Sequence, residues 1–440
     1  MKTDFAPAQL SDPAMVSSEA IIRSCVHCGF CTATCPTYLL LGDERDSPRG
    51  RIYLIKDMLE NNRAPSRDVV DPLDRCLSCL SCMTTCPSDV HYMHLVDHAR
   101  AYIEENYRRP LGDRVLRALL AFILPYPGRF RAALALARAV KPLVPLFRRL
   151  GLPGSFIAML ELVPDFSLRD VRGDETLPTV ARRGRAILLR GCAESVLQPA
   201  IGAAAKRALE REGYEVVVVR GETCCGSLVH HMGREADAAA AARRNIDAWT
   251  AEIEKGDIVG IVSTAAGCGT TLKNYGFLLR NDRAYARKAE AVSSLARDIS
   301  ELVEVPSSRR SPAAAAITVA YHSACSLQHG QKIHERPMRL LAAAGFAVAS
   351  IPEGHLCCGS AGVYNILQPD IAGRLRSRKL EHIERLAPDI VAAGNIGCIV
   401  QLSQAAGRPV VHTIELLDWA GGGPIPAACR TLSQFAASSE

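Results

Sequence analysis

Two short runs of cysteines near the N-terminus have the spacing of iron–sulfur cluster ligands. Both runs read C-x2-C-x2-C-x3-C-P, the first from Cys25 to Pro36 and the second from Cys76 to Pro87. In such a run three closely spaced thiolates hold one [4Fe–4S] cluster, whereas the fourth cysteine ligates the neighbouring cluster. The spacing therefore predicts two clusters with interleaved ligands. The first set is Cys25, Cys28, Cys31 and Cys86, and the second is Cys35, Cys76, Cys79 and Cys82.

Zinc is the alternative metal for closely spaced cysteines, and the pattern argues against it. Structural zinc sites use Cys-x2-Cys pairs, often with histidine, without a third cysteine two residues further on. His27 lies between two of the cysteines, and we interpret it as a surface residue or one that contacts the ligands. Modules with two such clusters pass single electrons, so we expect electron transfer and no bond chemistry on a substrate here.

Eight further cysteines form two copies of one pattern in the second half of the chain. The first copy is Cys192, Cys224, Cys225 and Cys268, and the second is Cys325, Cys357, Cys358 and Cys398. The offset is 133 residues both from Cys192 to Cys325 and from Cys224 to Cys357, and it is 130 residues from Cys268 to Cys398. This constancy indicates an internal duplication of a Cys-Cys-Gly unit.

Strand and helix patterns alternate in the same order in both copies. Short β-branched or apolar runs predict strands at residues 186–190, 214–219 and 258–262 in the first copy, and at 317–321, 346–351 and 389–393 in the second. Helices are expected at 198–212, 337–344 and 371–385, and the order β-α-β-α-β favours parallel sheets. Each cysteine position follows a strand, and loops after parallel strands gather at one sheet edge. We therefore expect the four cysteines of each unit to converge, in a mixed α+β and α/β chain.

Composition narrows the class of protein. The 440 residues include 17 cysteines, and the N-terminal sequence has no apolar signal core. Disulfide scaffolds are short secreted chains, so this number of cysteines favours metal or redox chemistry in the reducing cytoplasm. The net charge of +6 is small for this length and argues against nucleic-acid binding.

A basic helical segment separates the cysteine runs from the duplicated region. Residues 111–150 carry eight lysines and arginines against one acid, Asp113, and the breakers Pro125 and Pro127 divide them into helices. Such a composition suits peripheral contact with an anionic membrane or partner, and equally a solvated arginine face over a buried one. No uninterrupted apolar run is long enough to span a bilayer. We expect four parts: residues 1–110 with two clusters, the linker 111–184, which ends in a polar, breaker-rich stretch, unit 1 at 185–310 and unit 2 at 311–440.

The sequence closely resembles the iron–sulfur subunit of bacterial glycolate oxidase (glycolate dehydrogenase). The residues that carry the resemblance are CVHCGFCTATCPTY from Cys25 to Tyr38, the following Gly42-Asp-Glu44, and DSPRGRIYLIK from Asp46 to Lys56. The similarity continues through the second run and both Cys-Cys-Gly units. It implies an electron-transfer subunit that works beside two flavin-type subunits, which oxidise glycolate to glyoxylate. It also implies transfer to a quinone or another non-oxygen acceptor at the cytoplasmic face of the membrane. The chain lacks a G-x-G-x-x-G fingerprint, in agreement with a flavin and a substrate site on other polypeptides.

The Cys-Cys-Gly units resemble those of heterodisulfide reductases, where they hold clusters of unusual geometry. Here the closing C-x-x-C is reduced to Ala265-x-x-Cys268 and Asn395-x-x-Cys398, which leaves four thiols per unit instead of five. One ordinary cluster per unit, one shared cluster, a structural role and a docking surface for the flavin subunits all remain open.

Three functions follow from these patterns. The first is the glycolate oxidase subunit, and the second is the equivalent subunit of a glycerol-3-phosphate, lactate or heterodisulfide oxidoreductase. The third is an iron–sulfur assembly scaffold or redox sensor.

The sequence also gives expectations for several other residues. Histidines 230, 231, 322 and 355 are expected either at the surface or around the thiols, Arg49 and Arg51 in salt bridges or partner contacts, and Cys429 as a free structural thiol.

Overall fold

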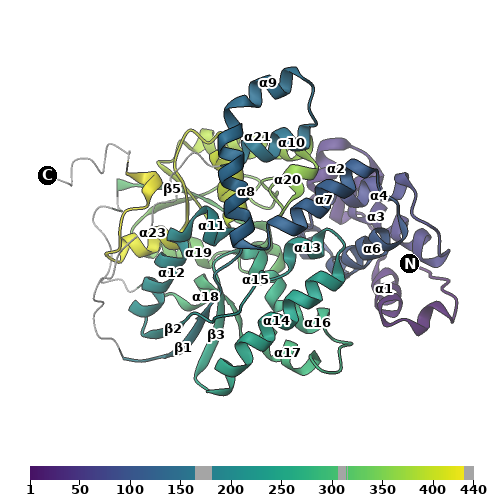
Figure 1. The fold of residues 1–440 in the computed structure, drawn as a ribbon, viewed down its shortest axis with the longest axis horizontal. Helices are drawn as coiled ribbons and strands as arrows, with labels where there is room; N and C mark the ends of the chain where they lie inside the picture. The colour runs from purple at the N-terminus through teal and green to yellow at the C-terminus, as the bar shows by residue number, and fades with distance from the viewer. Residues whose placement is uncertain (164–180, 306–313, 315, 431–440) are drawn as a thin grey trace.

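The computed structural model describes residues 1–163, 181–305, 314 and 316–430 (Figure 1). Most of the polar stretch predicted at the end of the linker lies outside these residues, as does the predicted boundary at residues 310 and 311. The described chain forms a helical N-terminal region, a helical arm and two α/β units.

The N-terminal region is built from short helices, with no strand among its described residues. Proline starts α1, α2 and α3, where its fixed φ suits the first helical turn, and the Oγ of Ser47 caps α3 by accepting from the Gly50 amide at 3.0 Å. Fully buried Ile22, Ile55 and Leu95 contribute to one core beneath the cysteine runs. The elements are η1 (Gln9–Ser11), α1 (Pro13–Ser24), η2 (Phe30–Thr32), α2 (Pro36–Leu41), η3 (Glu44–Asp46), α3 (Pro48–Glu60), α4 (Arg67–Asp74), α5 (Ser81–Thr85) and α6 (Tyr92–Asn106).

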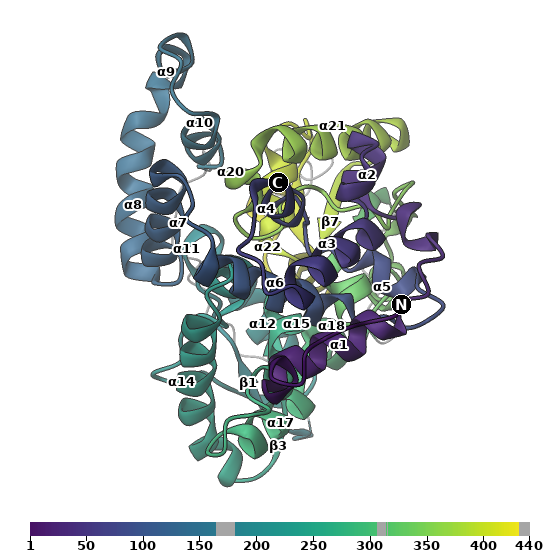
Figure 2. The ribbon, with the colours of Figure 1, turned by 90° about the vertical axis from the view of Figure 1, so that its right-hand side faces the viewer.

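The linker is a bent helical arm. Helix α7 (Leu111–Ile123) ends just before Pro125, and α8 (Pro127–Val140) begins at Pro127, as the breakers predict. The arm continues through η4 (Lys141–Leu143), α9 (Val144–Arg149) and α10 (Gly154–Glu161). In Figure 2 α9 projects furthest from the rest of the chain, whereas Leu134 of α8 packs against Val196 of unit 1. No described helix alone has the length and apolarity of a membrane span. The pair Leu111–Ile123 and Pro127–Arg149, bent by 120°, meets that criterion jointly.

Each Cys-Cys-Gly unit contains a four-stranded parallel sheet. In unit 1 the order is β2-β1-β3-β4, formed by β1 (Gly184–Leu188), β2 (Tyr214–Val217), β3 (Ile258–Ser263) and β4 (Ala296–Asp298). In unit 2 the order is β6-β5-β7-β8, formed by β5 (Thr318–His322), β6 (Ala347–Ser350), β7 (Ile390–Ala393) and β8 (Val410–His412). The identical order confirms the predicted parallel fold class and agrees with a duplication. The fourth strands were not predicted, because three residues are too few to show a periodic pattern.

Helices cover both sheets. Unit 1 contains α11 (Glu194–Leu197), α12 (Pro199–Arg211), α13 (Ser227–His231), α14 (Glu235–Glu254), α15 (Ala266–Lys273), α16 (Tyr275–Leu278), α17 (Ala286–Leu295) and α18 (Ile299–Leu302). Unit 2 contains the π-helical turn η7 (Ser326–Gly330), α19 (Arg336–Ala343), α20 (Tyr364–Leu367), α21 (Pro369–Leu386), α22 (Ile396–Ser403), α23 (Thr413–Ala420) and η8 (Ala427–Cys429).

The two units share one apolar core and a buried ion pair. Side chains of both sheets, among them Val262 and Val391, belong to the same buried cluster. Arg207 and Arg211 of α12 both bind the carboxylate of Asp418 on α23, and all three residues are buried. The N-terminal helices lie against both units, with α6 beside α13 and α2 beside α21 (Figures 1 and 2).

Candidate iron–sulfur sites

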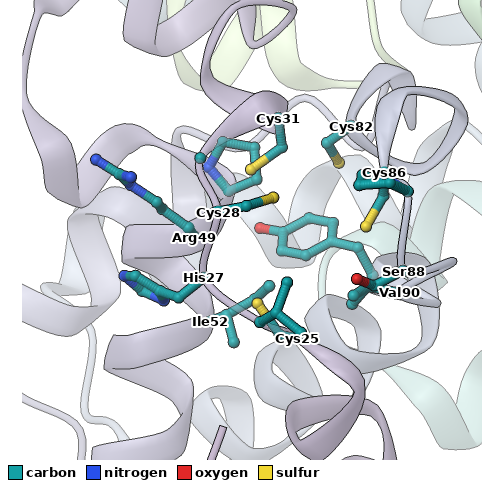
Figure 3. Close-up of a pocket in the computed structure, with 15 residues that line it drawn as sticks. Cys25, His27, Cys28, Cys31, Arg49, Ile52, Cys82, Cys86, Ser88 and Val90 are labelled. Atoms are coloured by element: carbon teal, nitrogen blue, oxygen red, sulfur yellow. The ribbon is translucent and has the colours of Figure 1, made fainter.

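The four cysteines of the first predicted set line one pocket (Figure 3). Cys25, Cys28, Cys31 and Cys86 surround it, and Cys82 of the second set lies at its edge. Their backbone makes a tight loop because Gly29 adopts φ +88°, a conformation that a side chain would strain. A Cβ at this position would also lie 2.4 Å from Nη1 of Arg49. His27 lines the same pocket. The loop thus presents clustered sulfurs, as a cluster site requires.

The second predicted set lies deeper in the protein. Cys35, Cys76, Cys79 and Cys82 are all buried. They are near one another, since the charges of Cys35 and Cys76 both contribute to the raised pKa of Cys79 and of Cys82. Cys82 joins this group to the first pocket, so the two sets adjoin.

Burial strongly affects these thiols. Desolvation raises the pKa of Cys79 and Cys82 well above the ordinary value for a thiol. A buried thiolate group of this kind is stable only if a cation replaces the protons, and iron binding supplies that charge. At Cys76 burial also acts to raise the pKa, but the guanidinium groups of Arg51 and Arg100 outweigh it, and the pKa is lowered.

Two arginines hold the second set in place. Arg51 is fully buried, with Nη1 3.7 Å from the Cys35 sulfur, Nη2 3.2 Å from Oδ1 of Asp46 and Nε donating to the Pro72 carbonyl at 2.7 Å. Arg100 of α6 donates to the Ser78 hydroxyl at 2.6 Å and to the Cys76 carbonyl at 2.5 Å. The salt bridge expected for Arg51 is therefore present, and Arg49 pairs with Glu44. Arg100 was not identified from the sequence, although a cation among the apolar residues of α6 was a usable signal.

Unit 1 brings its four thiols together after the carboxyl ends of β1, β2 and β3. The Cys192 and Cys224 sulfurs are 3.3 Å apart, and those of Cys225 and Cys268 are 3.1 Å apart. The glycine after the paired cysteines, Gly226, has φ +90° and leaves space for the Ala238 backbone. Hydrogen bonds from Cys192 and Cys225 lower the pKa of Cys224 well below its ordinary value, and Arg244 adds a smaller effect of the same sign.

Unit 2 forms the equivalent site with one additional group. The Cys325 and Cys357 sulfurs are 3.8 Å apart, and Gly359 repeats the φ of +90° found at Gly226. The sulfurs of Cys358 and Cys398 and a ring nitrogen of His322 all lie within 4.8 Å of one another. Asn395, which replaces the missing cysteine of the C-x-x-C pattern, has Nδ2 3.5 Å from the Cys398 sulfur.

The other expected histidines have different positions. His230 and His231, just after the Cys-Cys-Gly of unit 1, lie 3.8 Å from opposite carboxylate oxygens of Asp97 on α6. The carbonyl of His355 lies 3.2 Å from Nε2 of His329, whose Nδ1 is 2.8 Å from the Thr84 hydroxyl. Cys429 is a fully buried free thiol in the core that the two units share.

The second cysteine run adjoins the thiols of unit 2. Cys79 and Cys357 belong to one buried cluster, against which Cys325 packs. The turn η7, which follows Cys325, also contacts α15, which carries Cys268 of unit 1, and the Thr270 hydroxyl donates to the Ser326 carbonyl at 2.9 Å. The structure therefore connects the first pocket, the second set and both units in one continuous arrangement.

Comparison with known proteins defines the class of this chain. Residues 21–90 match the 4Fe-4S dicluster domain, and residues 187–273 and 319–403 each match the Cysteine-rich domain. A crystal structure of a hypothetical protein from Helicobacter pylori shares the fold, with a TM-score of 0.52 at 12% identity, over 95% of this chain and 74% of that one. The fold and the sites are thus those of an iron–sulfur electron-transfer protein.

Relatives along the whole chain identify the family. The glycolate oxidase iron-sulfur subunit of Escherichia coli (strain K12) is 39% identical over 96% of this chain and 99% of its own length. The probable glycolate oxidase iron-sulfur subunit of Bacillus subtilis (strain 168) is 29% identical over 92% of this chain and 95% of its own. Lactate utilization protein A of Bacillus licheniformis is 27% identical over 52% of this chain and 96% of its own length. The chain belongs to the family of glycolate oxidase iron–sulfur subunits.

Proposed function

We propose that this protein relays electrons from a flavin-type subunit that oxidises glycolate, through two [4Fe–4S] clusters and the Cys-Cys-Gly units, to a quinone or similar acceptor. The clusters would be held by the two interleaved cysteine sets. The observation that carries the proposal is the position of Cys79 beside Cys357 and Cys325. This arrangement gives electrons a direct way from the second cluster into unit 2.

Electrons would enter at the first cluster. Cys28 is exposed, and large apolar side chains around the first pocket are exposed as well, including Val26 at 67% and Phe30 at 63%. Exposed apolar groups gathered at one place indicate a protein interface. We assign this face to the flavin-type subunits, two of which the family resemblance implies.

Electrons would leave near the helical arm. A cavity of about 650 Å³ lies between α7 and α14 and is lined by Leu119 and Phe122 of the arm and by Cys224 of unit 1. Large apolar side chains are also exposed along the arm. They are Leu111, Val115, Leu119, Phe122, Tyr126, Leu136, Leu143, Leu146 and Leu150.

The charge of the arm supports peripheral contact with the inner face of the cell membrane. Its one acid, Asp113, is bound by Arg109 and Arg117, so the remaining charges of residues 111–150 are positive. Anionic lipid attracts such a surface, and apolar side chains then insert into the lipid boundary. A lipophilic acceptor in the membrane would then lie beside the thiols of unit 1.

Two variants of the complete complex test the relay. Cys31→Ser and Cys79→Ser should leave flavin reduction by glycolate nearly intact while transfer to quinone is lost. The matched control is Cys429→Ser, which changes a buried cysteine outside all four sets and should keep both steps. Loss of flavin reduction in a Cys79→Ser protein that retains its other cluster would contradict the relay.

Iron and sulfide analysis of the anaerobically purified complex tests the role of the Cys-Cys-Gly units. About eight irons per chain would restrict the clusters to the N-terminal region, and twelve or more would support further clusters. If the complex oxidises lactate or glycerol 3-phosphate and does not oxidise glycolate, the chain is instead the equivalent subunit of a lactate or glycerol-3-phosphate oxidoreductase. A scaffold or sensor would release its clusters readily to a chelator, whereas the buried second set should retain them.

A further inference from the structure

The two Cys-Cys-Gly units differ at one buried position beside their thiols. The offset of 133 residues that relates Cys192 to Cys325 also relates Leu189 to His322. Leu189 belongs to the apolar core of unit 1 and is 3% exposed, whereas His322 ends β5 in unit 2 and is 1% exposed. The duplication thus has a nitrogen donor in one copy where the other has only a hydrocarbon side chain.

His322 has no hydrogen-bond partner among the described residues. Both Nδ1 and Nε2 are buried and unpaired. An imidazole always carries at least one N–H, and in its neutral form also one lone pair, so burying it unpaired is unfavourable. Buried histidines of known structures generally satisfy these groups, as His329 does here through Thr84 and the His355 carbonyl.

The unpaired ring lies among sulfurs. One of its nitrogens is within 4.8 Å of the sulfurs of both Cys358 and Cys398. Thiolate sulfur together with imidazole nitrogen is a common donor set for zinc and for iron, and a metal centre at this place would use the lone pair that the protein leaves unpaired.

We propose that His322 is a nitrogen ligand of the metal centre of unit 2, together with Cys358 and Cys398. The proposal rests on the proposed function, in which unit 2 holds a metal centre. Unit 1, with Leu189 at the equivalent position, has thiolate ligands alone. A neutral nitrogen in place of an anionic thiolate raises the reduction potential of an iron–sulfur centre. A raised potential in unit 2, which adjoins Cys79, favours electron transfer to it from the second cluster.

Pulsed electron paramagnetic resonance of the full-length protein tests this ligand directly. Protein produced with natural-abundance histidine should show a strong ¹⁴N coupling at one reduced centre, and ¹⁵N-histidine should replace it with the ¹⁵N pattern. In His322→Leu, which copies the residue of unit 1, the coupling should disappear. The matched control is His334→Leu, at an exposed histidine of the same unit, and it should retain the coupling. If the centre is zinc, X-ray absorption at the zinc edge gives the equivalent nitrogen signal, and the relay through unit 2 is then refuted because zinc carries no electrons.

Measurements of metal content show whether unit 2 holds a metal centre at all, which is a separate question from whether His322 is one of its ligands. Cys358→Ser should lose the metal of unit 2, whereas Cys225→Ser should lose only that of unit 1. If Cys358→Ser retains the metal content of the unchanged protein, unit 2 holds no centre, and this proposal fails together with that part of the relay. If Cys358→Ser loses metal but no nitrogen signal is present in the unchanged protein, the role of His322 alone is refuted. The isotope comparison needs no variant, so it remains decisive if His322→Leu fails to fold.

Discussion

Cys79 of the second cysteine run and Cys357 of unit 2 lie in one buried cluster, although the whole helical arm and unit 1 separate them in sequence. Their neighbours in this cluster include Leu77 from the N-terminal region and Leu375 from α21. The buried apolar side chains of this cluster separate the contact between the second cysteine run and unit 2 from solvent. The cluster also fixes their separation, because buried side chains are closely packed.

Shortening one side chain of this cluster should affect both stability and electron transfer. Leu375→Ala removes buried apolar volume and is expected to cost about 2–5 kcal/mol of stability. It should also slow reoxidation of the second cluster, measured by stopped-flow spectroscopy after reduction with glycolate. Leu209→Ala, at a fully buried leucine in the core shared by the two units, is the matched control. It should lower stability by a similar amount and leave the rate of reoxidation of the second cluster unchanged. Equal slowing in both variants would show that the contact between Cys79 and Cys357 has no specific role in electron transfer.

The positive charge of Arg51 should raise the midpoint potential of the second cluster. Its guanidinium lies 3.7 Å from the Cys35 sulfur in a buried site, so it stabilises the more negative, reduced form of the cluster. Arg51→Met should therefore lower the midpoint potential of that cluster in a redox titration followed by electron paramagnetic resonance. Stability should fall by about 1–3 kcal/mol, because Thr37 and the Pro72 carbonyl lose a hydrogen-bond partner. Arg45→Met, at an exposed arginine of the same region, should change neither quantity appreciably. A potential that stays constant in Arg51→Met would contradict this effect.

The buried ion pair between the two units should be sensitive to loss of its acid. Asp418→Asn leaves the guanidinium groups of Arg207 and Arg211 buried without their counter-charge, which is expected to cost about 3–5 kcal/mol. Thermal unfolding followed by circular dichroism should show a clearly lower midpoint. Glu215→Gln, which removes one partner of the exposed pair with Arg182, should change stability by about 1 kcal/mol or less. Similar midpoints for the two variants would show that Asp418 is not important for joining the units.

The buried carboxyl of Asp298 should make stability depend on pH. Burial raises its pKa to about 6, although Ser300 donates hydrogen bonds to the carboxylate. The folded protein therefore keeps this proton between about pH 4 and 6, where the unfolded chain has already released it. The contribution of Asp298 to stability is thus largest at about pH 4 and below, falls by about 3 kcal/mol between about pH 4 and 6, and stays at that lower level at higher pH. Asp298→Asn cannot ionise and should lose this dependence.

Thermal midpoints of both proteins at pH 5 and pH 7.5 test this prediction. The midpoint of Asp298→Asn should rise relative to that of the unchanged protein as the pH increases. Parallel pH profiles would mean that Asp298 has an ordinary pKa in the folded state.

The sequence by itself determined the local features of this protein. The two cysteine runs predict iron–sulfur clusters, because the spacing of cysteines within each run can be read directly from the chain. The fixed offset between Cys192 and Cys325 revealed the duplication, and strands of four to six residues were long enough to predict parallel sheets. These features depend on neighbours that are near in sequence.

Only the tertiary structure decided how these parts meet. The proximity of Cys79 to Cys357, the burial of Arg100 behind Cys76 and the unpaired nitrogens of His322 all arise from packing between distant segments. A lone histidine after a strand looks the same in sequence whether it faces solvent or two thiols. Its surroundings are fixed by the fold, since the two thiols near His322 belong to segments that follow different strands of one sheet.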